Sequence, residues 1–519
     1  MLQCPAVSSC NSQEGAVARV AFVYPPYTKN GKHPHLSQNR QVRFTASTQV
    51  RIYPLIPASL LTLVSKGGHK ALLLDAINRR LSREVYERDL VTFDPDVIVL
   101  EAKTPIMPKL WREVARLKEL CADAAIVIVG DHVTARPLET MQACPCDYIA
   151  LGGDYDAVVA DLVDAITSGC ALPQGVVSRT SAGSVEPCFV GDLDTLPPPD
   201  RELTRWRDYG EAYLHLPAMY ILSGRGCGRR GKSHAGCTFC SWQQNLWRGR
   251  ARLRSPRSVV EEMDALVRRH GVGEFFDDNE SGGLWNREWT KEFCARLRSK
   301  GLHRRTMISS NARADSLSDD TCHDIAAAGF RLLKVGLESA NDATLKKLNK
   351  GESVEEIRAG VMRAKDRGLR VLLTMMVGYP WETEEEARAT FELARELLTY
   401  KARFGDALQC SVVVPYPGTS LFRTAAANGW NAVGPTDYER YDMDTNVLTT
   451  GVDTRYWCGR IWRLYLDHKY LRRLLGSARS VRDFRLGLRG LRSLIGHLSD
   501  YGAENRKRTA ARIDVGVGP

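Results

Sequence analysis

The chain has 519 residues, of which 44% are hydrophobic, and a formal net charge of +11. This length predicts two or three domains, and the lack of an uncharged apolar run of about 18 residues excludes a membrane-spanning helix. The first residues show no basic stretch followed by an apolar core, so we expect no secretory signal and a cytoplasmic location.

The N-terminal part alternates between apolar strands and helices. Residues 1–17 are polar and are expected to be a disordered lead-in. The alternation predicts a Rossmann-like, doubly wound α/β domain over residues 18–170, with its ligands at the carboxyl ends of the strands. The predicted strands are 18–27, 69–75, 95–101, 125–130 and 147–152, and the predicted helices are 57–67, 111–121 and 154–167. Residues 171–214, which contain three consecutive prolines, are expected to be a linker.

A second α/β series begins near residue 219. Its strands are predicted at 219–227, 274–278, 306–315, 332–339, 370–380 and 407–417, and its helices at 258–271, 286–300, 318–329, 353–368 and 384–400. Six such units predict an open, partial (β/α) barrel over residues 215–420, with its site at the carboxyl ends of the strands. Thr383 and Glu386 have the spacing of a capping box at the start of the last helix.

The C-terminal region is helical, aromatic and basic. Residues 421–504 are predicted to form a helical domain, and 505–519 a disordered tail. Eleven Arg and Lys residues and two Asp residues lie between Arg455 and Arg492. This stretch suits either an anionic surface, such as a membrane, or a solvated helical cap, and both alternatives remain open. We do not expect a nucleic acid as partner, because no RNA-binding module is recognisable.

Three cysteines follow the first barrel strand directly. Cys227, Cys237 and Cys240 have the spacing C-x9-C-x2-C. Cysteines this close together in a reducing compartment indicate a metal site. Three thiolates can hold three irons of a 4Fe-4S cluster and leave the fourth iron open, whereas a zinc knuckle with His234 as fourth ligand is the alternative. The other eleven cysteines are expected to be buried or exposed free thiols.

Several stretches, taken in order, resemble the cobalamin-dependent radical S-adenosylmethionine (SAM) enzymes. They are PPY after the first strand, VGDHVTARPLE, DYIALGGDYDAV, LDTLPPPDREL, SGRGC…CTFC, FFDDN, NARADSL, GLESANDATLKKLNKG, MVGYPWETEEE and VPYPGTSLF. The resemblance covers roughly residues 18–425 and favours iron–sulfur over zinc. The family's usual first gap has three residues, so the nine-residue gap GRRGKSHAG is a departure, expected to bulge out at the surface.

The resemblance implies which residues bind the cofactors. The cluster ligands are Cys227, Cys237 and Cys240. The expected SAM contacts are Phe239, Asp277, Asp278, Ser310, Asn311, Arg313, Glu338, Ser339, Gly378 and Pro380. The expected cobalamin contacts are Pro25, Pro26, Tyr27, Thr104, Gly130, His132, Thr134, Gly152 and Gly153.

Some of these residues have expected roles. Glu338 would hold the ribose hydroxyls or the ammonium of SAM, and Arg313 its carboxylate. Gly378 and Pro380 would let the backbone approach adenine. Because the glycine of D-x-H-x-x-G is missing after His132, cobalamin is expected to bind without histidine as its lower ligand. Asp277 and Asp278 are adjacent, so they point to opposite sides of a strand.

The leading hypothesis is therefore a methyltransferase acting on an unactivated carbon of a small secondary-metabolite or lipid-like substrate. It would use methylcobalamin and a 5′-deoxyadenosyl radical, with an external electron donor of the flavodoxin or ferredoxin type. A cobalamin-dependent cyclase or rearrangement enzyme without methyl transfer is the alternative within the family. A non-catalytic cobalamin- or metal-binding regulator is the alternative from another class. The sequence does not predict the substrate or the oligomeric state.

Overall fold

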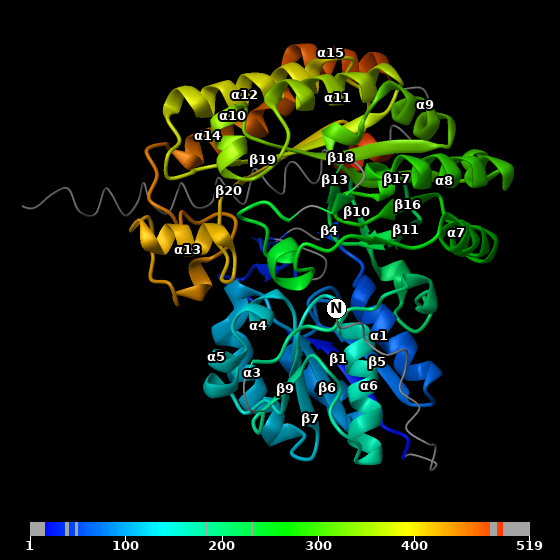
Figure 1. The fold of residues 1–519 in the computed structure, drawn as a ribbon, viewed down its shortest axis with the longest axis vertical. Helices are drawn as coiled ribbons and strands as arrows, with labels where there is room; N and C mark the ends of the chain where they lie inside the picture. The colour runs from blue at the N-terminus through cyan, green and yellow to red at the C-terminus, as the bar shows by residue number, and fades with distance from the viewer. Residues whose placement is uncertain are drawn as a thin grey trace, which may run out of the picture.

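The computed structural model describes residues 16–36, 41–46, 50–181, 184–229, 232–233, 235–477 and 485–490. The predictions for the lead-in (residues 1–15), for His234 and for the tail (505–519) lie outside these residues. The N-terminal α/β domain sits below a six-stranded partial barrel, and the helices of residues 454–477 lie on the outer side of the barrel (Figure 1). The predicted α/β architecture is confirmed.

The N-terminal sheet has the strand order β5-β1-β6-β7-β8-β9. The strands are β1 (Arg19–Tyr24), β5 (Lys70–Asp75), β6 (Val97–Glu101), β7 (Ala125–Val129), β8 (Tyr148–Ala150) and β9 (Val176–Ser178). The first five run parallel, and β9 pairs antiparallel with β8 at the edge. The central strands are apolar on both faces because helices cover both sides. β9 falls in the range expected to be a linker, so the sheet extends beyond residue 170.

Six helices accompany this sheet: α1 (Leu55–Lys66), α2 (Arg83–Phe93), α3 (Met107–Leu120), α4 (Asp131–Ala135), α5 (Pro137–Ala143) and α6 (Tyr155–Ser168). The sequence analysis missed α2 because only Tyr86 and Leu90 of this helix are buried, so it has almost no apolar stripe. Cys170 and Cys188 are disulfide-bonded. The expectation of free thiols is therefore wrong for these two cysteines.

The barrel sheet has the order β11-β16-β17-β18-β19-β20, and every pair is parallel. The strands are β11 (Ala218–Ile221), β16 (Glu274–Asp277), β17 (Met307–Ala312), β18 (Phe330–Glu338), β19 (Arg370–Val377) and β20 (Ala407–Val412). The helices are α7 (Pro256–His270), α8 (Arg287–Ser299), α9 (Asp319–Ala327), α10 (Asp342–Lys347), α11 (Val354–Asp366) and α12 (Glu384–Thr399). The open six-stranded barrel is confirmed, and so is the capping box of Thr383 and Glu386.

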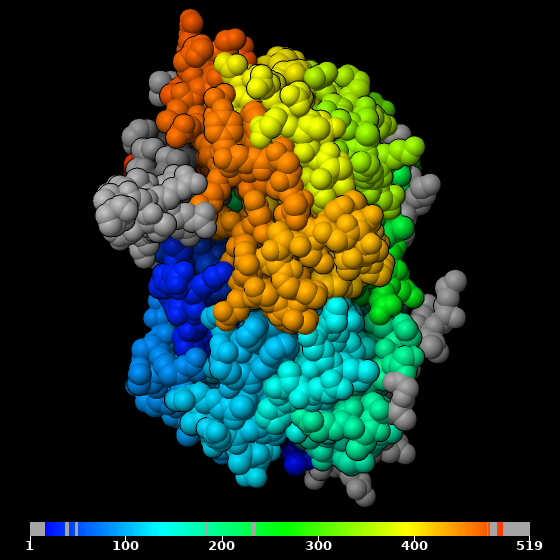
Figure 2. All heavy atoms as spheres, turned by 90° about the vertical axis from the view of Figure 1, so that its left-hand side faces the viewer, coloured from blue at the N-terminus to red at the C-terminus, as the bar shows by residue number. Residues whose placement is uncertain are grey.

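The C-terminal region contributes α13 (Ser420–Ala427), α14 (Thr454–Arg463) and α15 (His468–Ser477). α14 buries Trp457 and Ile461 against β20 and α12. Figure 2 shows the segment between α13 and α14 lying directly on the N-terminal domain. Among the described residues, no helix combines the length and apolarity that a bilayer crossing needs.

A segment of the N-terminal domain lies against the last two barrel strands. It carries the short strands β2 (His33–Pro34), β3 (Phe44–Thr45) and β4 (Val50–Arg51), of which β4 pairs with β10 (Gly210–Glu211). Gln41 accepts a hydrogen bond from Ser411 Oγ on β20 at 2.9 Å and lies 3.6 Å from Met376 Sδ on β19. The barrel mouth is thus bounded partly by the N-terminal domain.

A buried ion network joins the N-terminal domain to the barrel. Arg225 in β12 (Gly224–Arg225) donates to both carboxylate oxygens of Asp156 at 2.8 and 2.6 Å, and to Asp154 at 2.8 Å. Arg252 in β15 (Arg252–Leu253) also donates to Asp154. The Asp154 and Asp156 side chains are fully buried. These pairs hold the start of α6 against the strands that precede and follow the cysteine loop.

Candidate active site

The cysteine loop lies at the carboxyl end of β11. Cys227, Cys237 and Cys240 are all half-buried. Part of the nine-residue gap forms a small hairpin, in which β13 (Gly228–Arg229) pairs with β14 (Lys232–Ser233). The expected excursion therefore includes a paired ladder next to the first cysteine.

Arg229 anchors this hairpin. Its guanidinium lies 3.7 Å from Asp315 and against Gly351, where a Cβ would come within 2.2 Å of Arg229 Nη1. Gly228 in turn packs on Trp285, since a Cβ there would be 2.1 Å from the indole ring. The position of Cys227 is thus set by close contacts on both sides of the hairpin.

Two glutamines hold the loop from the other end. A π-helical turn, η4 (Trp242–Leu246), follows Cys240. Gln243 Oε1 accepts from the backbone N–H of Cys227 at 2.9 Å, and Gln244 Nε2 donates to the carbonyl of Cys237 at 2.5 Å. The sequence analysis missed both glutamines, although their place directly after the third cysteine was a usable signal.

Burial keeps the thiol of Cys237, the second cysteine of the loop, protonated. It raises the pKa of Cys237 to about 12, whereas nearby Lys350 and Arg313 act in the opposite direction. Without metal the thiol therefore keeps its proton, and the two cations favour the thiolate that a metal requires.

The cysteines are not arranged around one point. In the part of the chain that the structure describes, no three His, Cys, Asp or Glu side chains lie close enough together to hold a single metal ion. A 4Fe-4S cluster does not require this, because each thiolate binds a different iron.

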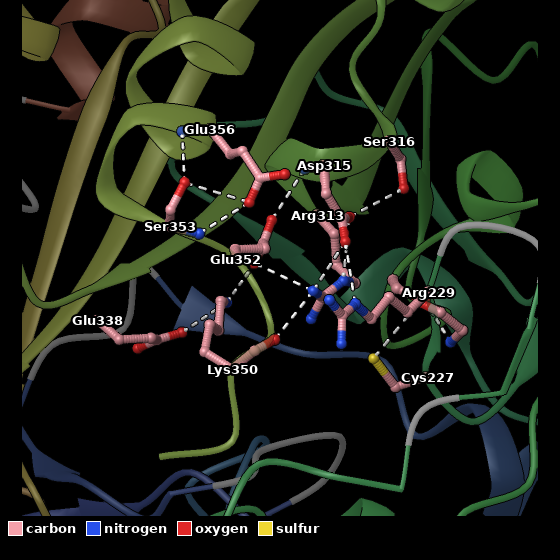
Figure 3. A network of polar contacts seen from close by, with 12 residues as sticks. Cys227, Arg229, Arg313, Asp315, Ser316, Glu338, Lys350, Glu352, Ser353 and Glu356 are labelled. Atoms are coloured by element: carbon pink, nitrogen blue, oxygen red, sulfur yellow. Dashed lines mark hydrogen bonds and ion pairs between the residues drawn. The ribbon is translucent and has the colours of Figure 1, made fainter. Parts of the chain in front are cut away.

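A charged network flanks the cysteines (Figure 3). Lys350 Nζ lies 3.3 Å from Glu338 and 3.4 Å from Glu352. Arg313 makes two hydrogen bonds to Asp315, at 3.2 and 3.0 Å, and donates to the carbonyl of Lys350 at 3.0 Å. All five side chains are at most 12% exposed. Arg313, expected to bind the SAM carboxylate, thus already holds protein partners.

The two cations of this network remain charged. Burial alone lowers the pKa of Lys350, but Glu352, Glu338 and the Cys237 thiol outweigh it and raise this pKa. Arg313 behaves in the same way, with Glu352, Asp315 and Cys227 raising its pKa against burial. The sequence analysis did not identify Lys350 or Glu352, because they follow α10 rather than the end of a strand.

Glu338 occupies a strained backbone position. Its φ is +61°, which is rare for residues other than glycine, and the pairing of β18 with β19 shifts register between Gly336 and Glu338. Gly336 leaves room for the ion pair, since a Cβ there would lie 2.2 Å from Glu338 Oε1 and 2.7 Å from Lys350 Nζ. Such strain costs about 1–3 kcal/mol and gathers at functional sites. Ser339 follows it and accepts from the N–H of Asn341.

Asp277 and Asp278 have different partners, as adjacent strand residues should. Asp277 accepts from the N–H and the hydroxyl of Ser223, at 2.9 and 2.6 Å, and its pKa is raised, mainly by burial. Asp278 accepts from Asn311 Nδ2 at 3.3 Å. Ser310 donates to the carbonyl of Asn311. The structure therefore places Asp278 beside Asn311, whereas Asp277 supports the turn after β11.

Gly378 does not leave open space. Its φ is +91°, and a Cβ would meet Thr454 of α14 at 2.7 Å. A Cβ at this position would thus point toward α14, and the contact of this glycine with adenine stays a prediction. Phe239 packs with Leu348 and Tyr379 in a small apolar cluster next to half-buried Pro380.

Glycines in the N-terminal loops allow close approaches, and Gly153 faces the segment that follows the cysteines. A Cβ on Gly153 would lie 2.1 Å from the Trp247 ring, and the Gly153 N–H donates to Leu246 O at 3.0 Å. Thr134 accepts from the Gly152 N–H at 3.0 Å. Gly130 approaches the backbone of Ala102, with 2.5 Å from a Cβ to its carbonyl oxygen. These loops at the carboxyl ends of β6, β7 and β8 therefore meet the barrel.

His132 is buried between the domains. Its Nδ1 lies 3.1 Å from Thr104 Oγ1, and its ring stands edge-on to Tyr438 at 4.7 Å. Burial, with a smaller contribution from Arg136, lowers its pKa to about 3, so it stays neutral. The PPY turn (Pro25, Pro26 and Tyr27) comes directly after β1. Tyr27 donates its N–H to Pro25 O. Its side chain is buried, and burial together with Glu113 of α3 raises the pKa of its hydroxyl.

A buried lysine links the N-terminal strands to the cysteine loop. Lys103 lies 3.4 Å from both Glu101 and Asp131, and its Nζ stands 5.2 Å from the centre of the Trp242 ring. Asp131 also accepts from Ser241 Oγ at 2.7 Å. Ser241 and Trp242 directly follow Cys240, so this network couples the two domains at the cysteine loop. The sequence analysis missed it, because its three segments, at residues 101–103, 131 and 241–242, are far apart along the chain.

Residues 221–394 match the Radical SAM superfamily. The chain contains a radical SAM domain. It is 28% identical over 386 residues to an uncharacterized methyltransferase, PH0819, of Pyrococcus horikoshii, covering 72% of this chain and 79% of that protein. It is 26% identical over 450 residues to the anaerobic magnesium-protoporphyrin IX monomethyl ester cyclase of Rubrivivax gelatinosus, covering 83% and 73%.

Two solved structures share the fold of the radical SAM domain and of the flanking regions. The radical SAM methyltransferase TsrM from Kitasatospora setae, with cobalamin and a [4Fe-4S] cluster bound, superposes with a TM-score of 0.66 at 16% identity, covering 93% of this chain and all of that chain. The cobalamin-dependent SAM radical enzyme OxsB gives 0.62 at 15% identity, covering 93% and 72%. The similarity thus extends over the N-terminal domain, the barrel and part of the C-terminal region.

Proposed function

We propose that this radical SAM protein is a cobalamin-dependent methyltransferase acting on an unactivated carbon of a small-molecule substrate. One observation carries the proposal: the segment directly after the three cysteines of the first barrel strand packs on the carboxyl-end loops of a Rossmann-like sheet. The contacts of Gly153 with Trp247 and of Asp131 with Ser241 support it. A further relative is named bacteriochlorophyllide d C-12(1)-methyltransferase, from Chlorobaculum tepidum, at 24% identity over 67% of this chain.

The cysteine loop fits a cluster with one open iron. Cys227, Cys237 and Cys240 would be its ligands, and Lys350 and Arg313 would stabilise the thiolates. When bound, SAM at the open iron supplies a 5′-deoxyadenosyl radical and cobalamin carries the methyl group. The hairpin and the two glutamines would hold the loop in place, while Phe239 would keep water from one side.

The remaining polar residues would bind SAM. Glu338, held by Lys350 in a strained turn, would accept from the ribose hydroxyls or the ammonium group. The carboxyl ends of the neighbouring strands would also contact SAM, through Asp278, Asn311, Ser310 and Ser339. We assign a positioning role to three further residues, because each already has a neighbour in the protein. Arg313 binds Asp315, Asp277 accepts from Ser223, and Gly378 packs against Thr454.

The N-terminal loops would hold cobalamin. Thr104 and Thr134 provide hydroxyl groups, and Gly130, Gly152 and Gly153 let the backbone come close. His132 would not ligate cobalt, because it packs between Thr104 and Tyr438. Lys103 and Asp131 would fix the distance between these loops and the cysteines. Pro25, Pro26 and Tyr27 would act only by shaping the turn after β1.

This function requires one protein partner, an external electron donor of the flavodoxin or ferredoxin type, because the cluster must receive an electron before SAM is cleaved. For the basic C-terminal stretch, we favour the helical cap over a membrane contact, because α14 buries its apolar face against β20 and α12. Sedimentation with anionic liposomes tests this choice, and salt-sensitive binding would reverse it.

The methylation is tested with SAM labelled in its methyl group. The enzyme, reconstituted without oxygen, is incubated with cobalamin, reductant and a candidate substrate, and the product is analysed by mass spectrometry. A labelled product supports the methyltransferase. An unlabelled product formed together with 5′-deoxyadenosine would instead support a cyclase or rearrangement enzyme, which the similarity to the cyclase over 83% of this chain also suggests. Absence of 5′-deoxyadenosine would leave the non-catalytic regulator.

A further inference from the structure

A cleft of about 470 Å³ opens beside the cysteine loop. Three parts of the chain form its walls. Thr134 of α4 comes from the N-terminal domain, Gln244 and Arg248 from the segment after Cys240, and Gly418 and Arg423 from the start of α13. The cleft therefore lies where all three parts of the molecule meet.

The charge of this cleft is positive. Arg248 and Arg423 are its only charged lining residues among those that the structure describes. Arg248 is 41% exposed and pairs at 3.7 Å with Glu186, which is itself 66% exposed. Such an exposed pair is weak, at about 0–1 kcal/mol, so a partner's carboxylate can replace it. Arg248 also has a φ of +48°, a conformation that non-glycine residues rarely adopt.

A short hydrogen-bonded path connects the cleft to the second cysteine. Arg423 Nη2 donates to Ser420 Oγ at 3.2 Å, and Ser420 Oγ donates to Gln244 Oε1 at 2.8 Å. Gln244 Nε2 then donates to the carbonyl oxygen of Cys237 at 2.5 Å. An exposed guanidinium is thus three hydrogen bonds away from the peptide of a proposed cluster ligand. The other side of the loop is closed, because Phe239 packs there against Leu348 and Tyr379.

We propose that this cleft is the docking site of a small acidic one-electron-transfer protein. The proposal rests on the proposed function, in which the cluster must be reduced. In this step the reduced donor gives one electron to the oxidised cluster, the donor is oxidised, the cluster is reduced, and no bond is made or broken. The two exposed arginines would steer acidic side chains of the donor to the cleft, from which the path through Ser420 and Gln244 leads to Cys237.

The test compares two reductants. The rate of 5′-deoxyadenosine formation is measured with a reduced flavodoxin, over a range of concentrations, and with dithionite, which needs no docking site. The Arg248→Glu, Arg423→Glu double variant should lose tenfold or more of kcat/KM for flavodoxin at low salt. Its rate with dithionite and its bound cobalamin should match those of the unaltered protein. The defect should shrink as salt rises, because screening weakens steering.

The matched control is Lys291→Glu, Arg304→Glu, which changes the net charge equally at exposed positions on and after α8. An equal loss in this variant would mean that overall charge, not the cleft, guides the donor, and would overturn the proposal. A milder variant, Arg248→Gln, Arg423→Gln, is measured alongside the glutamate variant. If both variants lose 5′-deoxyadenosine formation equally with flavodoxin and with dithionite, the proposal is also overturned. The cleft would then serve substrate binding, cofactor binding or stability. If the unaltered protein makes no 5′-deoxyadenosine with dithionite, the proposed function itself fails.

Discussion

Replacing Asp156 by alanine should weaken the attachment of the N-terminal domain to the barrel. Asp156 makes a two-bond ion pair with Arg225, in which the side chains are 0% and 5% exposed. Removing one partner of a buried pair costs about 3–5 kcal/mol, because the other charge stays buried. Arg225 retains Asp154 at 2.8 Å, so we expect the lower end of this range, about 3 kcal/mol, or more than a hundredfold in the unfolding equilibrium.

Urea unfolding at neutral pH, with the apoprotein and its variants side by side, measures this loss. The control is Asp164→Ala on the same helix, whose carboxylate is 53% exposed and pairs with His69 at 2.9 Å. That exposed pair should be worth about 1 kcal/mol or less. A loss below about 1 kcal/mol for Asp156→Ala, or equal losses for the two variants, would refute the assignment of a buried clamp.

Three further predictions concern single side chains. Burial, reinforced by Glu386 and Glu384, raises the pKa of Glu382 to about 7, so the native state binds more protons than the unfolded state between about pH 4.5 and 7. The contribution of Glu382 to stability should therefore fall by on the order of 3 kcal/mol as pH rises from about 4.5 to 7. Glu382→Gln should reduce the difference between melting curves at pH 5 and 8, and an unchanged difference would refute this assignment. Lys350→Met should lower the iron and sulfide content after reconstitution and destabilise the protein by about 3–5 kcal/mol, whereas Lys350→Arg should retain most of both; normal iron loading in Lys350→Met would speak against its role. His132→Gln should leave the electron paramagnetic resonance spectrum of bound cob(II)alamin unchanged, and a loss of nitrogen splitting in this variant would identify His132 as the cobalt ligand after all.

Parts of the fold could be read from the sequence because burial left a clear pattern. β6 and β7 are apolar on both faces, which is typical of buried parallel strands, and the Thr383 capping box marked the start of α12. α2 was missed because it buries only two side chains and thus has little apolar periodicity. β9 was missed because three residues at a sheet edge carry too little pattern to stand out from a loop.

Some parts of the candidate site could be predicted from the sequence and others could not. The cysteine spacing could be recognised because its residues are close together along the chain. Lys350 and the clamp of Asp156 could not, because their importance comes from contacts between residues up to 69 positions apart. Arg313 had the right chemistry for an anionic ligand, but only the fold reveals that Asp315 already occupies its guanidinium.

Anaerobic reconstitution with iron and sulfide tests the central claim most directly. The unaltered protein should take up about four irons per chain and, with SAM and dithionite, form 5′-deoxyadenosine. Cys237→Ala should lose both, while Cys294→Ala, which removes a buried thiol remote from the loop, should keep both. If Cys237→Ala still formed 5′-deoxyadenosine at the normal rate, the cysteine loop would not hold the cluster.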